Sequence, residues 1–246
     1  MTVENKKSNI LETESYLDIV FTEKRRPTSD YPNKLALHLL NTVYKKPGKI
    51  LDIGCGRGDI MRAFHDIGFE VSGLDISPKV TELVHPHTAK IANLEQDPMP
   101  FEPESFDFIF SKSVIEHVHN PVRMMETAIN ALKPGGIAVI MTPSWIHNQK
   151  SFYLDHTHVM PFTAPSFEDV LAFSGLSEVN VIHFHQLPFL WKAPWLKPLI
   201  YLFSKIPLPY GPLYRVPWSS GTEYNKLVRF SKEIMLLGVG QKKGEK

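Results

Sequence analysis

Glycines and acidic residues early in the chain have the spacing expected around a nucleoside ligand. The loop 52–58, Asp-Ile-Gly-Cys-Gly-Arg-Gly, follows the apolar run Lys49–Ile53 and precedes a helical pattern. Glycine lets the backbone approach a ligand closely and tolerates positive φ, so such a loop is typical of a nucleotide site. The dinucleotide fingerprint Gly-x-Gly-x-x-Gly, however, would need its third glycine at Asp59. The spacing therefore argues against a ligand with a pyrophosphate.

Two carboxylates further limit the kind of ligand that this region can bind. Asp52 ends the run before the loop, where its charge would repel a pyrophosphate but could pair with a cationic amino group, directly or through water. Asp75 ends the next apolar run, and from there a carboxylate can accept hydrogen bonds from both ribose hydroxyls. A nucleoside with a ribose, no phosphates and an amino-acid tail meets all of these requirements.

The elements that must hold these residues alternate between strands and helices. Hydrophobic periodicity predicts strands at 49–53, 71–75, 90–94, 106–111 and 137–142, and helices at 30–44, 59–67 and 121–132. Near-continuous apolar strands separated by helices imply a parallel sheet covered on both faces, which binds ligands at the carboxyl ends of its strands. We therefore expect functional side chains at Asp52–Gly58, Asp75–Ile76, Asn93–Leu94 and Ser111–Ser113.

The pattern changes after Pro143. Residues 144–165 predict a long loop over the sheet edge, followed by a helix at 165–175 and two antiparallel edge strands at 179–184 and 233–239. The expected fold class is α/β, a Rossmann-like, doubly wound, seven-stranded sheet, mostly parallel with an antiparallel last strand. We divide the chain into an N-terminal tail or lid (1–29), a main domain (30–187 and 231–246) and an inserted cap (188–230). The cap is rich in aromatic residues and proline, with a helix near Trp195–Ser204.

Four stretches together resemble the class I S-adenosylmethionine-dependent methyltransferases, in particular those that act on sugars and small molecules. Residues 50–58 (Ile-Leu-Asp-Ile-Gly-Cys-Gly-Arg-Gly) resemble their motif I, and residues 101–109 resemble the entry to their fourth strand. Residues 114–118 and 132–136 match the stretches that follow. The resemblance spans roughly residues 30–185. It implies an enzyme that takes a methyl group from S-adenosylmethionine and releases S-adenosylhomocysteine.

The resemblance also implies where the cofactor would bind. Glycines and Cys55 of the loop would line its methionine and ribose parts, Asp75 would bind the ribose hydroxyls, and Ile76 would lie against the adenine. Asn93 stands where many relatives have Asp, which keeps an acceptor but loses a charge. The full expected set is Asp52, Gly54, Cys55, Gly56, Gly58, Asp75, Ile76, Asn93, Leu94 and Ser111.

Catalysis needs an aligned acceptor and, for a hydroxyl, a base such as histidine. Residues 153–163 resemble an Asp-x-Thr-His-x-x-Pro-Phe/Tyr-Thr stretch of methyltransferases that act on sugars or other polar metabolites. On that alignment His158 is the first candidate for a base or substrate contact, and His156 is the second. For His117 a structural or cofactor-side role is favoured over catalysis.

Other assignments remain open in the sequence. A metal site could form from His156 and His158 with Asp155 and His147, but histidines in an irregular loop are more often hydrogen-bonded or exposed, and no metal is predicted. Tyr16 and Tyr31 are weaker candidates for closing over the cofactor. The cap could be a lid packed on the domain, a homodimer contact or a membrane-facing patch, and the first is favoured.

Composition limits the function classes. The formal net charge of +1 disfavours a nucleic-acid partner, and an Asn-Pro-Pro-Tyr-like motif is missing after the fourth expected strand. One cysteine, a polar N-terminus and the lack of an apolar run of about 20 residues favour the cytoplasm and no membrane span. We expect methyl transfer to an oxygen, less so a nitrogen, of a small polar acceptor such as a sugar or glycan precursor. The alternatives are an RNA, protein or lipid-type methyltransferase, or a non-catalytic cofactor-binding module.

Overall fold

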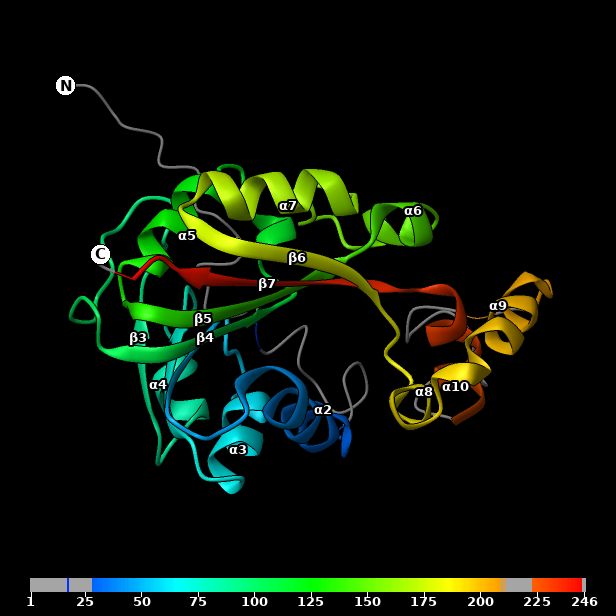
Figure 1. Cartoon of the computed structure of the whole chain (residues 1–246), viewed down its shortest axis with the longest axis horizontal. Helices are drawn as coiled ribbons and strands as arrows, with labels where there is room; N and C mark the ends of the chain where they lie inside the picture. The colour runs from blue at the N-terminus through cyan, green and yellow to red at the C-terminus, as the bar shows by residue number, and fades with distance from the viewer. Residues whose placement is uncertain (1–16, 18–27, 209, 211–222, 245–246) are drawn as a thin grey trace.

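The sheet of this protein confirms the predicted fold class. The computed structural model describes residues 17, 28–208, 210 and 223–244, with only the backbone of 223–225. Within these residues, seven strands form one sheet in the order β3-β2-β1-β4-β5-β7-β6, in which β7 alone runs antiparallel to its neighbours (Figure 1). The strands are β1 Lys49–Ile53, β2 Glu70–Asp75, β3 Thr88–Ile91, β4 Phe106–Lys112, β5 Leu132–Pro143, β6 Leu176–Phe184 and β7 Met235–Lys242.

Helices cover both faces of the sheet because successive strand residues are apolar. In β4, Ile109 faces the core beneath α5 (Pro121–Ile129) and α7 (Ala164–Phe173), whereas Phe108 and Phe110 face the core beneath α2 (Tyr31–Leu39) and α3 (Asp59–Asp66). This period of two is that of a strand buried on both sides. Figure 1 shows the two layers of helices above and below the sheet. The remaining short elements on this part of the chain are η2 Leu40–Tyr44, α4 Val80–Leu83 and η3 Ile115–His117.

Two strands differ from the sequence predictions. The third strand ends at Ile91, so Asn93 and Leu94 lie in the loop that follows it. It is an edge strand with mostly exposed side chains, and so the apolar pattern does not mark its bounds. The expectation of two edge strands near the C-terminus is wrong for β7, which lies between β5 and β6 and is buried over Met235–Gly238.

The segments expected to be a loop and a cap contain their own helices. Residues 144–165 hold α6 Trp145–Asn148 and η4 Phe152–Leu154. Residues 188–230 hold α8 Pro188–Lys192, η5 Pro194–Leu196, α9 Lys197–Lys205 and most of α10 Glu223–Lys232, so η5 and α9 together form the helix predicted near Trp195–Ser204. These elements extend from the end of the sheet at which β6 finishes and β7 begins (Figure 1).

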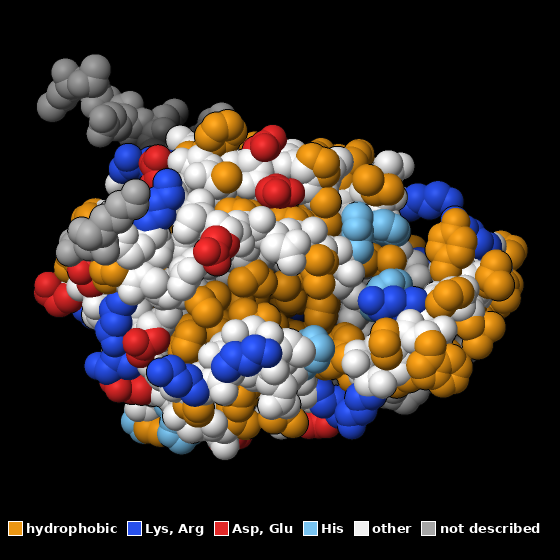
Figure 2. Space-filling model, viewed as in Figure 1, with side chains coloured by type: hydrophobic (Ala, Val, Ile, Leu, Met, Phe, Trp, Pro, Cys, Tyr) orange, Lys and Arg blue, Asp and Glu red, His pale blue; other side chains and the backbone are white. Residues whose placement is uncertain are grey.

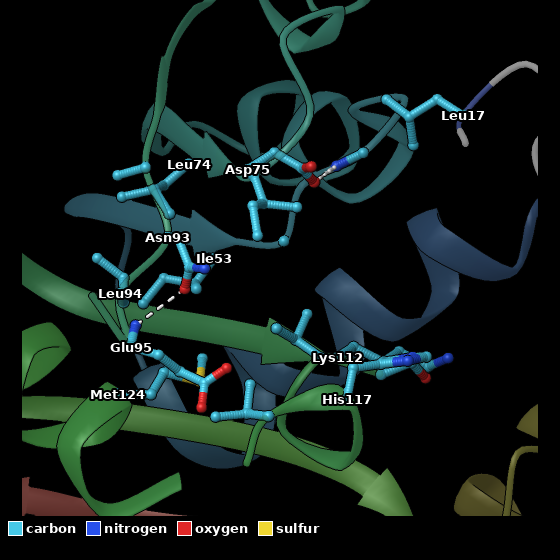
Figure 3. Close-up of a pocket in the computed structure, with 17 residues that line it drawn as sticks. Leu17, Ile53, Leu74, Asp75, Asn93, Leu94, Glu95, Lys112, His117 and Met124 are labelled. Carbon is cyan, nitrogen blue, oxygen red and sulfur yellow. Dashed lines mark hydrogen bonds between the residues drawn. The ribbon is translucent and has the colours of Figure 1, made fainter. Parts of the chain in front are cut away.

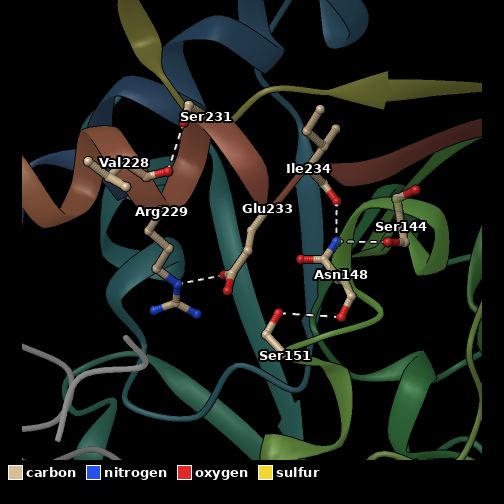
Figure 4. A network of polar contacts seen from close by, with 8 residues as sticks. All are labelled: Ser144, Asn148, Ser151, Val228, Arg229, Ser231, Glu233 and Ile234. Carbon is tan, nitrogen blue, oxygen red and sulfur yellow. Dashed lines mark hydrogen bonds and ion pairs between the residues drawn. The ribbon is translucent and has the colours of Figure 1, made fainter. Parts of the chain in front are cut away.

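A polar network fastens the start of β7 to the segment after β5 (Figure 4). The Asn148 side-chain nitrogen donates to the carbonyls of Ser144, at 2.8 Å, and Ile234, at 2.7 Å. Ser144 N also donates to Ile234 O at 3.0 Å. At the end of α10, Arg229 forms an ion pair with Glu233 at 2.6 Å. The buried amide of Asn148 thus joins segments 86 residues apart in the sequence.

Replacing Asn148 by alanine is expected to lower the free energy of unfolding by about 1–3 kcal/mol, because it leaves two buried carbonyls with fewer donors. Urea denaturation followed by circular dichroism measures the change. Ser151→Ala is the matched control, since its Oγ makes only a 3.4 Å contact with Asn148 O, and it should change stability by less than about 0.5 kcal/mol. Equal stability of Asn148→Ala and the wild type would show that the network contributes nothing.

Candidate functional site

A cavity lies at the carboxyl ends of β1, β2 and β4, where the parallel sheet is expected to bind its ligand (Figure 3). Together with the open space at its mouth it has a volume of about 910 Å³. Its lining comprises Leu17, Ile53, Gly54, Gly56, Leu74, Asp75, Ile76, Ala92, Asn93, Leu94, Glu95, Lys112, Ser113, Val114, His117, Val118 and Met124.

The backbone N–H groups of the glycine loop after β1 donate hydrogen bonds to other groups of the protein. Gly54 N and Cys55 N both donate to Leu74 O, at 2.7 and 3.1 Å, and Gly56 N donates to Asp75 Oδ2 at 2.8 Å. Gly54 has a φ of 74°, and a Cβ there would collide with Val114 Cγ2. A phosphate-binding loop instead directs consecutive N–H groups at its ligand. The geometry therefore fits a ligand without phosphates.

Asp75 is a buried carboxylate held in a fixed orientation at the cavity. Its Oδ1 accepts from Ser77 N at 2.9 Å and its Oδ2 accepts from Gly56 N. Burial raises the pKa of Asp75, and these backbone N–H groups act in the opposite direction. A carboxylate has about four lone-pair sites, so each oxygen can accept a further hydrogen bond. Asp75 can thus bind a pair of neighbouring hydroxyls.

One end of the cavity is apolar with a polar group at its rim. Ile76, Ala92, Leu94, Val118 and Met124 supply the apolar surface. In the loop beside them, the Asn93 side-chain oxygen accepts from Glu95 N at 3.1 Å (Figure 3). An apolar slot with a fixed amide at its edge suits a flat, partly polar ring such as a nucleobase.

The structure brings together six residues of the expected cofactor set: Gly54, Gly56, Asp75, Ile76, Asn93 and Leu94. The other four lie outside the lining. Ser111 Oγ donates to Ile53 O at 2.9 Å, and Cys55 packs with Met61 against α4. Gly58, with a φ of 76°, begins α3.

Asp52 lies beneath the loop with only 4% of its surface exposed. Burial and the nearby charge of Asp75 raise its pKa well above the ordinary value. The neutral acid is therefore favoured at Asp52 more than in an ordinary carboxyl. A cationic ligand group close to it would act in the opposite direction.

Further lining residues lie at the end of β4 and in the N-terminal segment. Lys112 ends β4 and Ser113 follows it, and both lie in the range Ser111–Ser113 where functional side chains were expected. Ser111 itself, which was expected to face the ligand, donates to Ile53 O of β1 instead. Leu17 reaches the cavity from the N-terminal segment, which was expected to be a tail or lid. Tyr16 lies outside the described residues. Tyr31 packs against Trp191 with ring centroids 6.0 Å apart and is not part of the lining.

His117 lines the cavity and is oriented by a chain of hydrogen bonds. Thr157 Oγ1 lies 2.6 Å from Asp155 Oδ1 and 2.9 Å from His117 Nδ1. Burial raises the pKa of Asp155, but hydrogen bonds from Thr157 lower it by more, so that it lies below its usual range. Asp155 is therefore an ionised carboxylate that accepts a hydrogen bond from the Thr157 hydroxyl. The Thr157 oxygen then accepts from His117 Nδ1, and Nε2 carries the lone pair of the neutral ring.

The two histidines favoured by sequence lie differently. His158 is next to His117, with ring centroids 4.7 Å apart, and its Nδ1 lies 2.7 Å from the carbonyl oxygen of Phe152, to which it must donate. It does not belong to the lining, and His156 is exposed. In the described part of the chain, Glu116, His117 and His158 form the group whose ligand atoms lie close enough to hold a metal ion, within 4.8 Å of one another. The absence of a resident metal stays a prediction.

Comparison with known proteins identifies a matching family and related enzymes. A family model described as a methyltransferase domain matches residues 23–181. A curated relative, the ubiquinone biosynthesis O-methyltransferase of Thiobacillus denitrificans, is 31% identical over 130 residues, or 50% of this chain and 55% of that protein. The chain thus spans about half the length of the curated relatives it matches.

Solved structures share the fold at low sequence identity. A putative methyltransferase in complex with the Trm112 activator, from Haloferax volcanii, has a TM-score of 0.65 and 19% identity and covers 93% of this chain and 98% of its own. Phosphoethanolamine N-methyltransferase 2 of Haemonchus contortus, in complex with phosphomonomethylethanolamine and S-adenosylhomocysteine, has a TM-score of 0.61 and 17% identity, covering 94% and 58%. At these identities the likeness concerns the fold alone.

Proposed function

Because the chain belongs to the methyltransferase-domain family of class I S-adenosylmethionine-dependent enzymes, we propose that it methylates an oxygen of a small polar acceptor. The observation that carries the proposal is the pairing at the glycine loop. The N–H groups of Gly54, Cys55 and Gly56 donate to Leu74 O and Asp75. The remaining lone pairs of Asp75 can accept hydrogen bonds from the hydroxyls of a ribose. A nucleoside without phosphates, such as S-adenosylmethionine, fits that arrangement.

The cavity offers a place for each part of such a ligand. Asp75 would bind the ribose hydroxyls, and the apolar slot that contains Ile76 and Leu94 would hold the adenine with Asn93 near its amino group. Gly54 and Gly56 would lie along the ribose and methionine parts, and the lining residues Lys112 and Ser113 would lie at the methionine end. Asp52, Cys55, Gly58 and Ser111 would then support the site from below, without direct contact.

We assign the role of general base to His117. When bound, S-adenosylmethionine supplies a methyl group already activated on a sulfonium. His117 Nε2 would take the proton from the acceptor hydroxyl as its oxygen bonds to the methyl carbon and the carbon–sulfur bond breaks. Asp155 would stabilise the resulting imidazolium through Thr157, because Nδ1 keeps its proton and its acceptor throughout. His158 would hold the His117 ring in place. His156, which is exposed, would contact only a part of the acceptor that lies at the protein surface.

The acceptor is specified only by class. An oxygen acceptor is supported by the printed activity of the curated relatives, which are O-methyltransferases. The proposal of a sugar or glycan precursor rests on the resemblance of residues 153–163 to a stretch of methyltransferases that act on sugars or other polar metabolites. RNA, protein or lipid acceptors, and a module that binds the cofactor without transfer, are the alternatives. An acceptor screen with methyl-labelled S-adenosylmethionine separates them.

The cofactor site is tested by calorimetry with S-adenosylhomocysteine. We expect one-to-one binding to the folded full-length chain. At a ligand concentration about 100 times the Kd, binding should also raise the free energy of unfolding by about 2.7 kcal/mol. Adenosine should bind more weakly, and NAD should not bind. The absence of both heat and thermal stabilisation, in a protein whose circular dichroism shows it to be folded, would refute the cofactor assignment.

A further inference from the structure

The helical segment formed by η5 and α9, together with Ile206 directly after it, is apolar on two sides. On the inner side, Leu196 and Ile200 pack into a small core. The other members of this core are Leu227 and Phe230 of α10, Leu190 of α8 and Leu187, which precedes α8. These contacts account for the folding of the helix against its neighbours. They do not account for the apolar side chains on the outer side.

The outer side presents large apolar side chains to solvent. Trp195, Leu199, Leu202 and Ile206 are spaced i, i+4, i+7 and i+11, and their exposed fractions are 76%, 61%, 64% and 46%. This is the spacing of one face of a helix. Scattered exposed apolar residues are ordinary, but a continuous row on one face marks an interaction surface. We call these four residues the outer row.

The charges around the outer row are of one sign. Lys192, Lys197 and Lys205 are exposed on the same segment of the chain, and Lys205 Nζ lies 4.5 Å above the ring of Tyr201. Residues 179–222 contain no aspartate or glutamate. Figure 2 shows the orange projection of this region with lysine and histidine side chains next to it. An apolar row on a segment that carries only positive charges is complementary to a surface that is apolar within and anionic at its edge.

We propose that the outer row of α9 is a docking surface for an anionic lipid bilayer. Trp195, Leu199 and Leu202 would enter the boundary between headgroups and acyl chains, while the lysines would remain at the phosphates. A second copy of the chain fits less well, because a two-fold contact would bring two copies of the same lysine-bearing segment together. Docking would be peripheral, since no helix in the described residues has the length and apolar character to cross a bilayer.

The test is flotation of the full-length protein with vesicles of phosphatidylcholine alone or with an equal part of phosphatidylglycerol. We expect binding to the mixed vesicles to be on the order of a hundredfold stronger than to the neutral ones, since three lysines lie at the surface. High salt should abolish the difference. Lys197→Glu with Lys205→Glu should reduce binding to the anionic vesicles to that of the neutral ones.

The double variant Leu199→Ser, Leu202→Ser should lower binding at least about tenfold. Both side chains are exposed, so it should keep the melting temperature of the wild type. Phe173→Ser is the matched control, because Phe173 is 75% exposed on α7, and it should bind like the wild type. The proposal fails if the folded wild type does not float with anionic vesicles, or if the double variant floats as well as the wild type. It also fails if sedimentation shows a dimer that the double variant abolishes.

Discussion

Replacing His117 by alanine is expected to lower kcat about 100- to 10,000-fold, the usual contribution of a general base. Affinity for S-adenosylhomocysteine should change by no more than a few fold, because the apolar slot and Asp75 remain. The measurement is methyl transfer from labelled S-adenosylmethionine to the hydroxyl acceptor found by screening, beside calorimetry on the same preparations.

Two neighbouring variants separate a base from a merely buried histidine. Thr157→Val keeps the shape of the side chain but removes the acceptor of the His117 Nδ1 proton, and a loss on the order of tenfold is expected for one charge-assisted hydrogen bond. His158→Ala should cost less than His117→Ala, because His158 lies outside the cavity lining. Loss of activity in His158→Ala with near-normal turnover in His117→Ala would reverse the assignment in favour of His158.

The position of His117 shows what sequence patterns can and cannot reveal. Periodicity predicts β1 at its observed bounds and the doubly wound sheet, because strands buried on both faces are apolar throughout. The orientation of His117 depends on Thr157, which lies 40 residues further along the chain, and spacing does not reveal such a contact. The stretch from residue 153 to 163 was predicted to contact the acceptor through its histidines. In the structure Thr157 of this stretch contacts His117, Asp155 accepts from Thr157, and His156 is exposed.

The same limit applies to the cofactor loop. Its glycines and Asp75 were predicted to lie at the strand ends, and the topology of a parallel sheet is sufficient for that prediction. Whether a given side chain faces the cavity depends on the local geometry. Ser111 turns onto Ile53 O, while Lys112 and Ser113, the residues that follow it, line the cavity. Leu17 lies in a segment without a clear pattern, and only its burial in the structure relates it to the site.

Replacing Asp75 by asparagine is expected to weaken binding of S-adenosylhomocysteine at least about a hundredfold. The amide keeps one acceptor oxygen, so one of the two hydrogen bonds from ribose hydroxyls to a charged group is lost and the other is weakened; such a bond is worth about 1.5–3 kcal/mol. The amide also cannot accept on both sides from Gly56 N and Ser77 N, which now hold the carboxylate. Calorimetry measures the change. Asp66→Asn, at an exposed carboxylate on α3, is the matched control and should bind as the wild type does.

The pH dependence of binding distinguishes an acceptor role for Asp75 from a purely structural one. The ionised form accepts the hydroxyls, so binding is strong above the pKa of Asp75 and is lost as the pH falls through it. Because burial raises that pKa, wild-type affinity should begin to fall at a higher pH than an ordinary aspartate, near 3.9, would give. In Asp75→Asn this decline should be absent. If the variant binds tightly, or if it shows the same decline as the wild type, another group binds the ribose and the placement of the cofactor must be revised.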